Sequence, residues 1–424
     1  MLRIALAALA LICCAAAAAA GPAEIRVWHS MSGVRGAEFE RLVARFNAEQ
    51  KPHSPHYRVV ATYKGAYDEG VLEAYTARRT PRAPHLVQAS ELGAAFLLEQ
   101  KDLARPLWQV AAESGAAFQV ESALGGAEEL TDAQGRLLAL PIGRSTPVLY
   151  WNRDAFRVAM LDPARPPATW YEMVATLAAL VQSGSDCALT IAWPASAMLE
   201  NTAAWHNQAF ATDRLVFNSR LAVRWISTLA TWKQSGYFTQ ATRRDEAESR
   251  FASGECALLA ASSANYADLR SRAKFALGIA QFPYYDDFDG APLNTLSAGA
   301  ALWVMAGRPK ADYPGVAQFL AFFARPEIQA EWHQRTGLVP LNAAAYELTR
   351  KQGFYSANPG HEVAVRQLLT RGTPNWKSLR LGQHPRLRNI IDEEIDFAWQ
   401  GKKTSLDALN AAVARGNAFL DQQK

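Results

Sequence analysis

The stretch IGRSTPVLYWNRDAF, residues 142–156, joins two patterns that decide how the chain is organised. Its second half contains the apolar run 148–151, which predicts a buried strand. Directly before that run stand a glycine, an arginine, two hydroxyl residues and a proline. This polar interruption falls where one series of alternating strands and helices ends and another begins, so its position needs a functional explanation.

Strand and helix patterns alternate on both sides of this stretch. Before it, strand-like runs cover 25–28, 57–61 and 86–88, and helical spacing covers 39–46, 67–79 and 91–100. After it, strand-like runs cover 148–152, 187–192 and 256–260, and helical spacing covers 170–181 and 221–229. This alternation predicts an α/β fold with parallel sheets flanked by helices. No long linker separates the two units, so we expect two lobes joined by several chain crossings around a hinged cleft.

Composition and charge exclude several functions. The chain has 424 residues, half of them hydrophobic, which is enough to bury two cores. Its 44 basic and 40 acidic residues give a net charge of +4, without a block of Lys and Arg, so nucleic acid is not an expected partner. Short motifs of serine hydrolases, zinc proteases, phosphate-binding loops and dinucleotide sites are missing. Glu393 and Glu394 fall in an apolar helical pattern, so we expect them on a solvated helix face and not in acid–base catalysis.

The first twenty residues, MLRIALAALALICCAAAAAA, have an early arginine, a short apolar core and an alanine-rich end. They predict a signal peptide over 1–20 and export of the rest of the chain. A membrane anchor is the alternative, but the run 4–20 is at the short limit for spanning. Export leaves Cys187 and Cys256 in an oxidising compartment, where they either form a bridge or pack as small buried hydrophobes. Too few cysteines remain for a metal cluster, and we expect neither a metal nor a cofactor.

Aromatic and hydroxyl side chains recur at the expected strand ends and turns. They are Trp28, Ser30, Tyr63, Tyr67, Ser145, Thr146, Ser262 and Ser263. In ligand pockets, rings cover the apolar faces of a polyol while hydroxyl and backbone N–H groups bond its oxygens. Each of these residues alone is equally explained by a core or turn role, so only their common placement favours a pocket.

Six longer strings resemble one family in order along nearly the whole mature chain. They are VWHSMSG (27–33), TYKGAY (62–67), STPVLYWNRDAF (145–156), SGECALLAASS (253–263), AEWHQRTGLVP (330–340) and LRLGQHPRLRNIIDEE (379–394). The chain resembles the periplasmic glycerol 3-phosphate-binding proteins of ABC uptake systems, within the wider family of extracytoplasmic solute-binding proteins. The resemblance implies the two-lobed periplasmic-binding-protein fold of type II, closure on a ligand, and delivery to membrane permease subunits. It places the N-lobe at 21–145 plus about 297–328 and the C-lobe at 146–296 plus about 329–424.

The resemblance also implies a ligand site, residue by residue. The matching polar or backbone contacts are Tyr67, Glu91, Ser145, Ser262, Gly299 and Arg388, and Trp193 matches a ring that covers the glycerol. A phosphate needs an arginine fork, hydroxyl donors and free backbone N–H groups, and this set contains all three. Glu91 repels phosphate, so we expect it at the glycerol end. The alternative for Arg388 is a surface salt bridge with the acidic run 392–394.

Three positions depart from the family pattern. Leu338 stands where the family has a tyrosine, Ser196 lies near the place of a second tryptophan, and Arg144 stands where a serine would precede Ser145. Losing a hydroxyl donor weakens phosphate binding by about 1 kcal/mol, which a new cation can offset. We therefore include Arg144 among the ligand residues, with an outward-pointing side chain as its alternative. A wider, less aromatic pocket would also admit a glycerophosphodiester such as glycerophosphocholine.

These features predict a monomeric periplasmic binding protein, not an enzyme. Its ligand is sn-glycerol 3-phosphate or a glycerophosphodiester, and its partners are the membrane permease subunits of an ABC importer. An oligosaccharide-binding protein of an ABC importer is one alternative, and an exported hydrolase is another. In the resembling fold the chain crosses between lobes just before residue 148, so Ser145 and Thr146 are expected at the cleft. This explains the polar run that precedes the strand.

Overall fold

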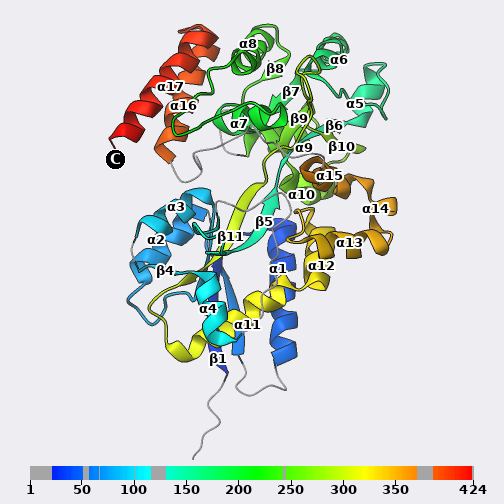
Figure 1. Ribbon diagram of the computed structural model, residues 1–424. Coiled ribbons are helices and arrows are strands. Elements are labelled where there is room, and N and C mark those ends of the chain that lie inside the picture. The colour runs from blue at the N-terminus through cyan, green and yellow to red at the C-terminus, as the bar shows by residue number, and fades with distance from the viewer. Residues whose placement is uncertain are drawn as a thin grey trace, which may run out of the picture.

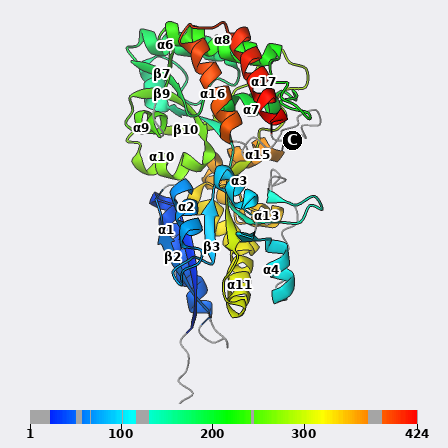
Figure 2. The ribbon, with the colours of Figure 1, turned by 90° about the vertical axis from the view of Figure 1, so that its left-hand side faces the viewer.

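The computed structural model describes residues 22–50, 57–65, 67–100, 102–115, 130–241, 245–369 and 385–422. Two β-sheets, each with helices packed against it, form two α/β units stacked along the long axis of the molecule (Figures 1 and 2). The predicted signal peptide, residues 1–20, lies outside the described residues. Among those residues, no helix combines the length and the apolar character needed to cross a membrane.

The first sheet contains the strands from the amino-terminal part of the chain and one strand from much later. Its members are β1 (Ala23–His29), β2 (Tyr57–Tyr63), β3 (Leu86–Ala89), β4 (Ala104–Arg105), β5 (Leu140–Ser145) and β11 (Ala298–Met305), in the order β2-β1-β3-β11-β4, with β5 also paired to β11. β1 runs parallel to β2 and β3, whereas β11 runs antiparallel to β3, β4 and β5.

The second sheet is built from the middle of the chain. Its members are β6 (Pro147–Asn152), β7 (Cys187–Ile191), β8 (Phe238–Thr239), β9 (Cys256–Ser262) and β10 (Leu277–Gln281), in the order β10-β6-β9-β7-β8. β7 is parallel to β8 and β9, but β6 is antiparallel to β9 and β10. The α/β class is therefore confirmed, while the expectation of purely parallel sheets is wrong. Strands β6 and β11 enter their sheets from the opposite unit, so they lack the helical crossover that makes neighbours parallel.

Helices cover both sheets. Those of the first half are α1 (Gly33–Gln50), α2 (Tyr67–Ala77), α3 (Glu91–Glu99), α4 (Leu107–Ser114), α5 (Arg153–Val158), α6 (Trp170–Gln182), α7 (Ser196–Trp205) and α8 (Arg220–Gln234). Those of the second half are α9 (Glu246–Ala252), α10 (Tyr266–Arg272), α11 (Tyr313–Ala324), α12 (Pro326–Thr336), α13 (Ala343–Lys351), α14 (Phe354–Ala357), α15 (Glu362–Leu369), α16 (Pro385–Trp399) and α17 (Ser405–Asp421). α16 and α17 pack beside α8 on the second unit, which brings the end of the chain next to its middle (Figure 1).

Each unit has its own aromatic core. In the first, α1 turns Phe39 and Phe46 toward Phe319 of α11, with ring centroids 6.3 and 5.3 Å apart. In the second, Trp170 of α6 meets Trp225 of α8 edge-on, with centroids 4.8 Å apart. Burial of such a large ring contributes about 2–3 kcal/mol, so these contacts fix how the helices lie on the sheets.

The two cysteines form a disulfide. Cys187 on β7 lies directly opposite Cys256 on β9, and the bond closes a sequence separation of 69 residues. Of the two alternatives left open by the sequence, the bridge is correct. Closing a loop of this length stabilises the folded state by about 4 kcal/mol in the chain-entropy account.

Glu393 and Glu394 on α16 were both expected on a solvated helix face, and the structure places one of them differently. Glu393 has a half-exposed side chain, but Glu394 is only 2 % exposed and accepts bonds from Lys403 and Arg415, both at 2.5 Å. Burial by itself raises the pKa of Glu394, but the two cations outweigh it and lower that pKa. The prediction of a fully solvated face is therefore wrong, because α17 packs over this side of α16.

The chain passes between the two units at three places, which we call the crossing segments: residues 144–147, 295–299 and 337–339. Residue 146 alone separates β5 of the first sheet from β6 of the second. The second crossing leads back to β11, and in the third Leu338 packs in the first core while Val339 packs in a cluster of the second unit. The polar run of residues 143–146 thus lies where the chain leaves one sheet for the other.

Candidate functional site

One edge of the first sheet gathers several of the predicted ligand residues. Tyr67 opens α2 after β2, and Glu91 opens α3 after β3. Since β2 and β3 are both parallel to β1, their carboxyl ends meet at the same edge. β11 runs antiparallel to β3, so its start, near Gly299, also lies there. The side chains of Tyr67 and Glu91 are outside the described part of the structure, which places only their backbone.

Two predicted hydroxyl groups meet across the sheets. Ser262, the last residue of β9, donates from its Oγ to the Oγ of Ser145 at 2.8 Å. The Ser262 Oγ also accepts from the backbone N–H of Ala264 at 3.2 Å, which caps a short turn. Ser145 ends β5 and Ser262 ends β9, so this contact joins the first sheet to the second.

Gly299 occupies a position that other residues cannot fill. Its φ is +146°, and a Cβ there would lie 1.8 Å from the carbonyl oxygen of Gly143. β11 and β5 approach closely at this point, where Gly299 pairs with Arg144. The sequence singled out this glycine as a backbone contact, and the structure adds a steric requirement for it.

Arg144 is buried at the crossing segments, with only 2 % of its surface exposed. Its Nη2 donates to the carbonyl oxygen of Ser297 at 2.6 Å, and its Nε donates to the Ser297 Oγ at 3.1 Å. The backbone carbonyl of Arg144 accepts from the N–H of Val339 at 2.9 Å. The side chain does not point outward, and the residue connects all three crossing segments.

A second network of buried hydrogen bonds connects the same crossing segments. The hydroxyls of Thr146 and Thr295 lie 2.5 Å apart. Gln367 of α15 donates to the Thr295 hydroxyl at 2.7 Å and to the carbonyl of Pro147 at 2.6 Å, and its side-chain oxygen accepts from the Phe282 N–H at 2.8 Å. These residues hold the crossings in one arrangement through satisfied polar contacts.

Arg388 lies apart from this network, on α16, where it faces α7. Its Nη2 is 3.8 Å from Oε2 of Glu200, and 22 % of its side chain is exposed. The neighbouring acids have other contacts, since Asp392 accepts from the Ser196 N–H at 2.8 Å and Glu394 binds α17. Within the described part of the chain, Arg388 has an ion-pair neighbour in Glu200, which the sequence did not suggest. We call Trp193, Ser196, Glu200, Arg388 and Asp392 the α7–α16 corner.

Trp193 stands at the entrance to α7 with an exposed ring. Its backbone is left-handed, with φ +56°, and 57 % of its surface is exposed. A bulky residue in this conformation costs about 1 kcal/mol or more, and leaving an indole in water forgoes its burial. An exposed ring held at such a cost fits the covering role implied by the resemblance.

The corner and the crossings are linked through α7. Asn201, next to Glu200, accepts from the Leu296 N–H at 2.9 Å, and Leu296 adjoins Ser297, the partner of Arg144. The structure therefore brings Arg144, Ser145, Ser262 and Gly299 together at the crossings and places the corner directly beside them. Glu200, Ser297 and Thr295 were missed from sequence. Glu200 carried the one available signal, a lone acid in the otherwise uncharged run SAMLENTAAW.

The structure shows the surroundings of two residues that depart from the family pattern, Leu338 and Ser196. Leu338 is 2 % exposed and packs in the first core, so an apolar side chain fills this position. Ser196 begins α7, where the carboxylate of Asp392 caps its N–H. Neither position presents an aromatic ring, as the sequence indicated.

Two buried histidines lie beside the third crossing. Nδ1 of His333 is 2.6 Å from the Leu338 carbonyl, and the Tyr355 hydroxyl is 2.8 Å from Nε2. Because a carbonyl only accepts, Nδ1 carries the proton and Nε2 accepts from Tyr355. Burial lowers the pKa of His333 to about 4, and burial together with His333 lowers the pKa of His361 to about 3. Both rings are therefore neutral at physiological pH.

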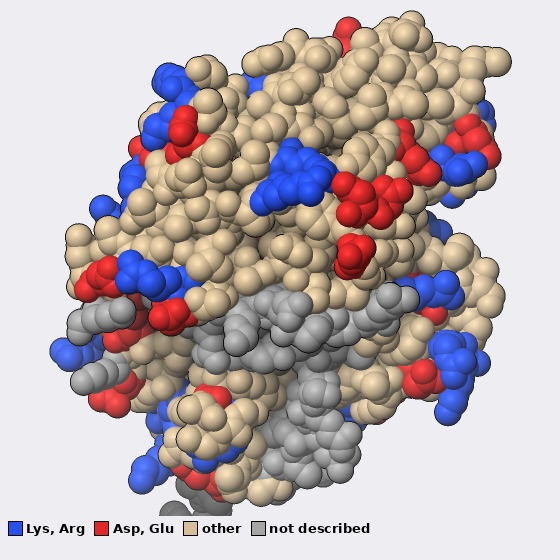
Figure 3. Space-filling model, turned by 45° about the horizontal axis from the view of Figure 1, so that its top comes forward, with Lys and Arg blue, Asp and Glu red and all other residues tan. Residues whose placement is uncertain are grey.

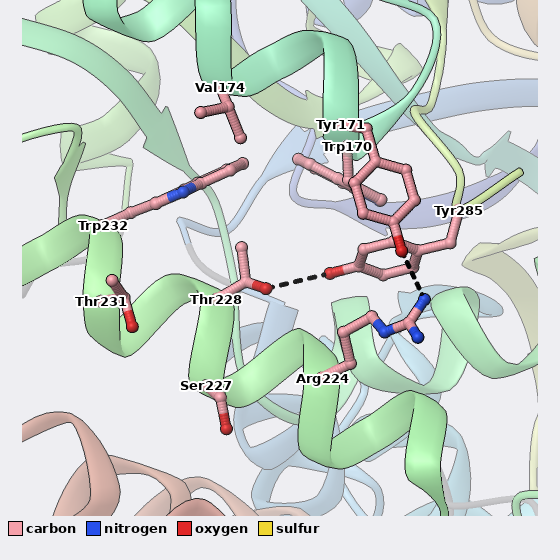
Figure 4. Close-up of a pocket in the computed structure, with 9 residues that line it drawn as sticks. All are labelled: Trp170, Tyr171, Val174, Arg224, Ser227, Thr228, Thr231, Trp232 and Tyr285. Atoms are coloured by element: carbon pink, nitrogen blue, oxygen red, sulfur yellow. Dashed lines mark hydrogen bonds between the residues drawn. The ribbon is translucent and has the colours of Figure 1, made fainter. Parts of the chain in front are cut away.

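A separate hollow of about 380 Å³ lies on the second unit between α6 and α8 (Figure 4). Its lining residues are Trp170, Tyr171, Val174, Arg224, Ser227, Thr228, Thr231, Trp232 and Tyr285. Arg224 is already engaged there, with Nη1 2.6 Å from Asp287 and 2.7 Å from the Tyr171 hydroxyl. This hollow contains none of the eight predicted ligand residues and is not the candidate site.

These features define a two-sheet protein whose polar groups converge where the chain crosses between units. The family model of bacterial extracellular solute-binding proteins matches residues 41–363, and the chain belongs to this family. The protein is therefore a solute-binding protein that acts outside the cytoplasm.

Among individual relatives, the chain is similar to sn-glycerol-3-phosphate-binding periplasmic proteins UgpB. That of Yersinia pseudotuberculosis serotype I (strain IP32953) is 42% identical over 412 residues, covering 94% of this chain and 92% of the relative. That of Escherichia coli O1:K1 / APEC is 42% identical over 433 residues, covering 99% and 97%.

Solved structures share the fold. UgpB from Mycobacterium tuberculosis in complex with glycerophosphocholine matches with a TM-score of 0.78 and 22% identity, covering 95% of this chain and 99% of that one. A cyclic alpha-maltosyl-1,6-maltose binding protein from Arthrobacter globiformis matches with a TM-score of 0.75 and 20% identity, covering 95% and 100%. The two-lobed α/β fold predicted from sequence is confirmed.

Proposed function

We propose that the protein captures sn-glycerol 3-phosphate or a glycerophosphodiester in the periplasm and delivers it to the permease subunits of an ABC importer. The observation that carries this proposal is the convergence of an arginine, two bonded serines and Gly299 at the crossing segments and the adjacent corner. The relatives named for glycerol 3-phosphate, 42% identical over nearly the full chain, support the ligand class.

Each part of the site has a role in binding. Arg388 supplies a charge-assisted fork for the phosphate, and Ser145 and Ser262 supply hydroxyl donors. Trp193 covers the carbon face of the glycerol, and Glu91 accepts from its hydroxyls. Closure of the lobes brings these groups onto the ligand. A micromolar complex requires about −8 kcal/mol, which one charged contact, several hydrogen bonds and closure supply.

Binding without chemistry agrees with how the two serines are held. Among the described residues, the hydroxyls of Ser145 and Ser262 bond to each other and to the Ala264 N–H, not to a histidine that would activate a nucleophile. On the face seen in Figure 3, basic and acidic side chains are interspersed, which supports a small solute over nucleic acid as partner. We propose that the protein acts as a monomer.

The lobe division follows the two cores. We propose an N-lobe of residues 21–145 with about 297–328 and a C-lobe of the remainder. Trp332, Leu338 and Leu341 belong to the first core, which supports moving the later boundary from 328 to about 341.

The test is a calorimetric titration of the purified mature chain with sn-glycerol 3-phosphate, glycerophosphocholine and maltose. We expect micromolar binding of at least one phosphate ester and no binding of maltose. Binding of maltose alone would establish the oligosaccharide alternative. Turnover of glycerophosphocholine by the wild type that is lost with the Arg388→Ala substitution would establish the hydrolase alternative.

A further inference from the structure

We propose that Asp392 is a positioning residue, which caps the start of α7 from α16 and thereby holds the ring of Trp193 in register with Arg388. Neither the sequence patterns nor the resemblance assigned Asp392 a role in binding. The inference rests on the proposed function, in which Trp193 covers the glycerol and Arg388 holds the phosphate. Asp392 acts through the helix that follows Trp193.

The start of α7 lacks a cap from its own segment. The residue before the helix is Ala195, whose side chain cannot accept a hydrogen bond, although the first N–H groups of a helix need acceptors. Asp392 supplies one, since its carboxylate accepts from the Ser196 N–H at 2.8 Å. Its negative charge also suits the positive end of the helix dipole. The first turn of α7 is therefore capped by a residue that lies 196 positions later in the chain.

The turn before α7 keeps Trp193 in a left-handed backbone conformation, with φ +56°, that a bulky residue rarely adopts. The carbonyl of Trp193 accepts from the Met198 N–H at 3.3 Å. The carbonyl of Pro194 accepts from Nε1 of Trp225, also at 3.3 Å. Both bonds are longer than usual for N–H donors, whereas the bond to Asp392 has an ordinary length. The cap from α16 therefore contributes to holding this turn, and with it the ring.

Contacts between α7 and α16 fall on successive turns. Asp392 bonds Ser196, and one turn away Nη2 of Arg388 lies 3.8 Å from Oε2 of Glu200. The residue numbers rise along α7 as they fall along α16, so the two helices run antiparallel at this contact. The bond of Asp392 limits how far α7 slides along α16, and so fixes the distance from the ring before α7 to the guanidinium. A ligand that touches both groups binds more tightly when that distance is set in advance.

The first test follows the ring itself and needs no ligand. The chain is labelled with 5-fluorotryptophan, and the ¹⁹F NMR signal of Trp193 is identified by its loss in a Trp193→Phe variant. We expect this signal to shift or broaden in Asp392→Ala and to keep its wild-type position in Asp392→Asn, because the amide oxygen of asparagine also caps a helix. A signal that is the same in the wild type and in Asp392→Ala would overturn the proposal.

The second test compares the same two variants by calorimetry with sn-glycerol 3-phosphate and with glycerophosphocholine. Both substitutions remove one negative charge, but only asparagine keeps an acceptor, so the difference between the variants isolates the hydrogen bond. We expect Asp392→Ala to bind either ester about fivefold more weakly than Asp392→Asn does, which is the size of effect that a helix cap produces. Equal affinities of the two variants would contradict the positioning role.

A double substitution separates positioning of the ring from a general effect on the fold. In a Trp193→Ala background no ring remains to be positioned, so the Ala and Asn variants at residue 392 should differ in affinity by less than about twofold. If the fivefold difference persists without the ring, Asp392 acts by another route and the proposal fails.

A matched control removes an acid at the next position of α16. Glu393 is half exposed and pairs with Arg415 at 2.7 Å, so Glu393→Ala should leave the fluorine signal of Trp193 unchanged. A change as large as that in Asp392→Ala would show that any lost acid on α16 disturbs the ring, which contradicts a specific cap. A wild-type protein that binds neither ester would overturn the proposed function, while the fluorine signals still decide whether Asp392 positions the ring.

Discussion

Two arginines that the sequence assigned to one ligand site have different surroundings. Arg144 is 2 % exposed and donates two hydrogen bonds to Ser297, whereas Arg388 has a side chain 22 % exposed and lies 3.8 Å from Glu200. The first guanidinium donates to a crossing segment, and the second faces a carboxylate on α7. A cation proposed for a binding site and a cation in a structural network thus look alike in sequence.

The difference follows from what each position connects. Arg144 lies where three separate crossings pass, and its guanidinium supplies hydrogen-bond donors to the carbonyl and hydroxyl of Ser297. Arg388 lies on a helix face toward α7, where the described contact of its side chain is with the carboxylate of Glu200. Substitutions at the two positions should therefore affect different quantities.

The largest expected effect is on affinity at Arg388. The Arg388→Ala variant should weaken binding of the phosphate ester by about 2–5 kcal/mol, because the charged phosphate loses its fork. Calorimetry measures this loss. The Arg386→Ala variant, two residues earlier on an exposed side of α16, should bind like the wild type. An unchanged affinity for Arg388→Ala would remove that residue from the site.

The next effect is on stability at Arg144. Replacing it with Met removes these two donors from the partly buried Ser297, which should lower the free energy of unfolding by about 2–3 kcal/mol. Urea denaturation measures the change, and Arg136→Met at an exposed turn serves as control. If stability is unchanged and affinity falls steeply, Arg144 contacts the ligand directly and the comparison between the two arginines fails.

The smallest expected effect is the share of the pH dependence of stability that comes from His333, beside the third crossing. His333 has a folded pKa of about 4 against an ordinary value of 6.5, so the unfolded chain binds more protons between these values. Stability should thus fall as pH drops through this window, by about 1–2 kcal/mol from pH 7 to pH 5 for this ring. The His333→Gln variant should show a correspondingly flatter profile in urea denaturation. If the wild type and the variant lose stability equally as pH falls, the lowered pKa of His333 is not the cause of that loss.

Local sequence patterns were sufficient to predict the positions of most helices and strands. Phe39, Leu42, Val43 and Phe46 predicted one face of α1, since this signal depends on neighbours along the chain. Strand direction was predicted incorrectly for β6, because the partner of a strand is set by distant segments. Glu394 was misplaced for the same reason, since α17 covers it from 21 residues away.

The sequence by itself determined the α/β class and most helix and strand positions and, through the resemblance, supplied the set of ligand residues that we propose. These features depend on periodicity and on short strings, which a chain carries before it folds. Only the tertiary structure decided that Cys187 and Cys256 are bonded, that Arg144 serves the crossings, and that Glu200 stands beside Arg388. Each of these depends on side chains from distant segments meeting in a place of low dielectric, where a single neighbour changes what a charge or a thiol can do.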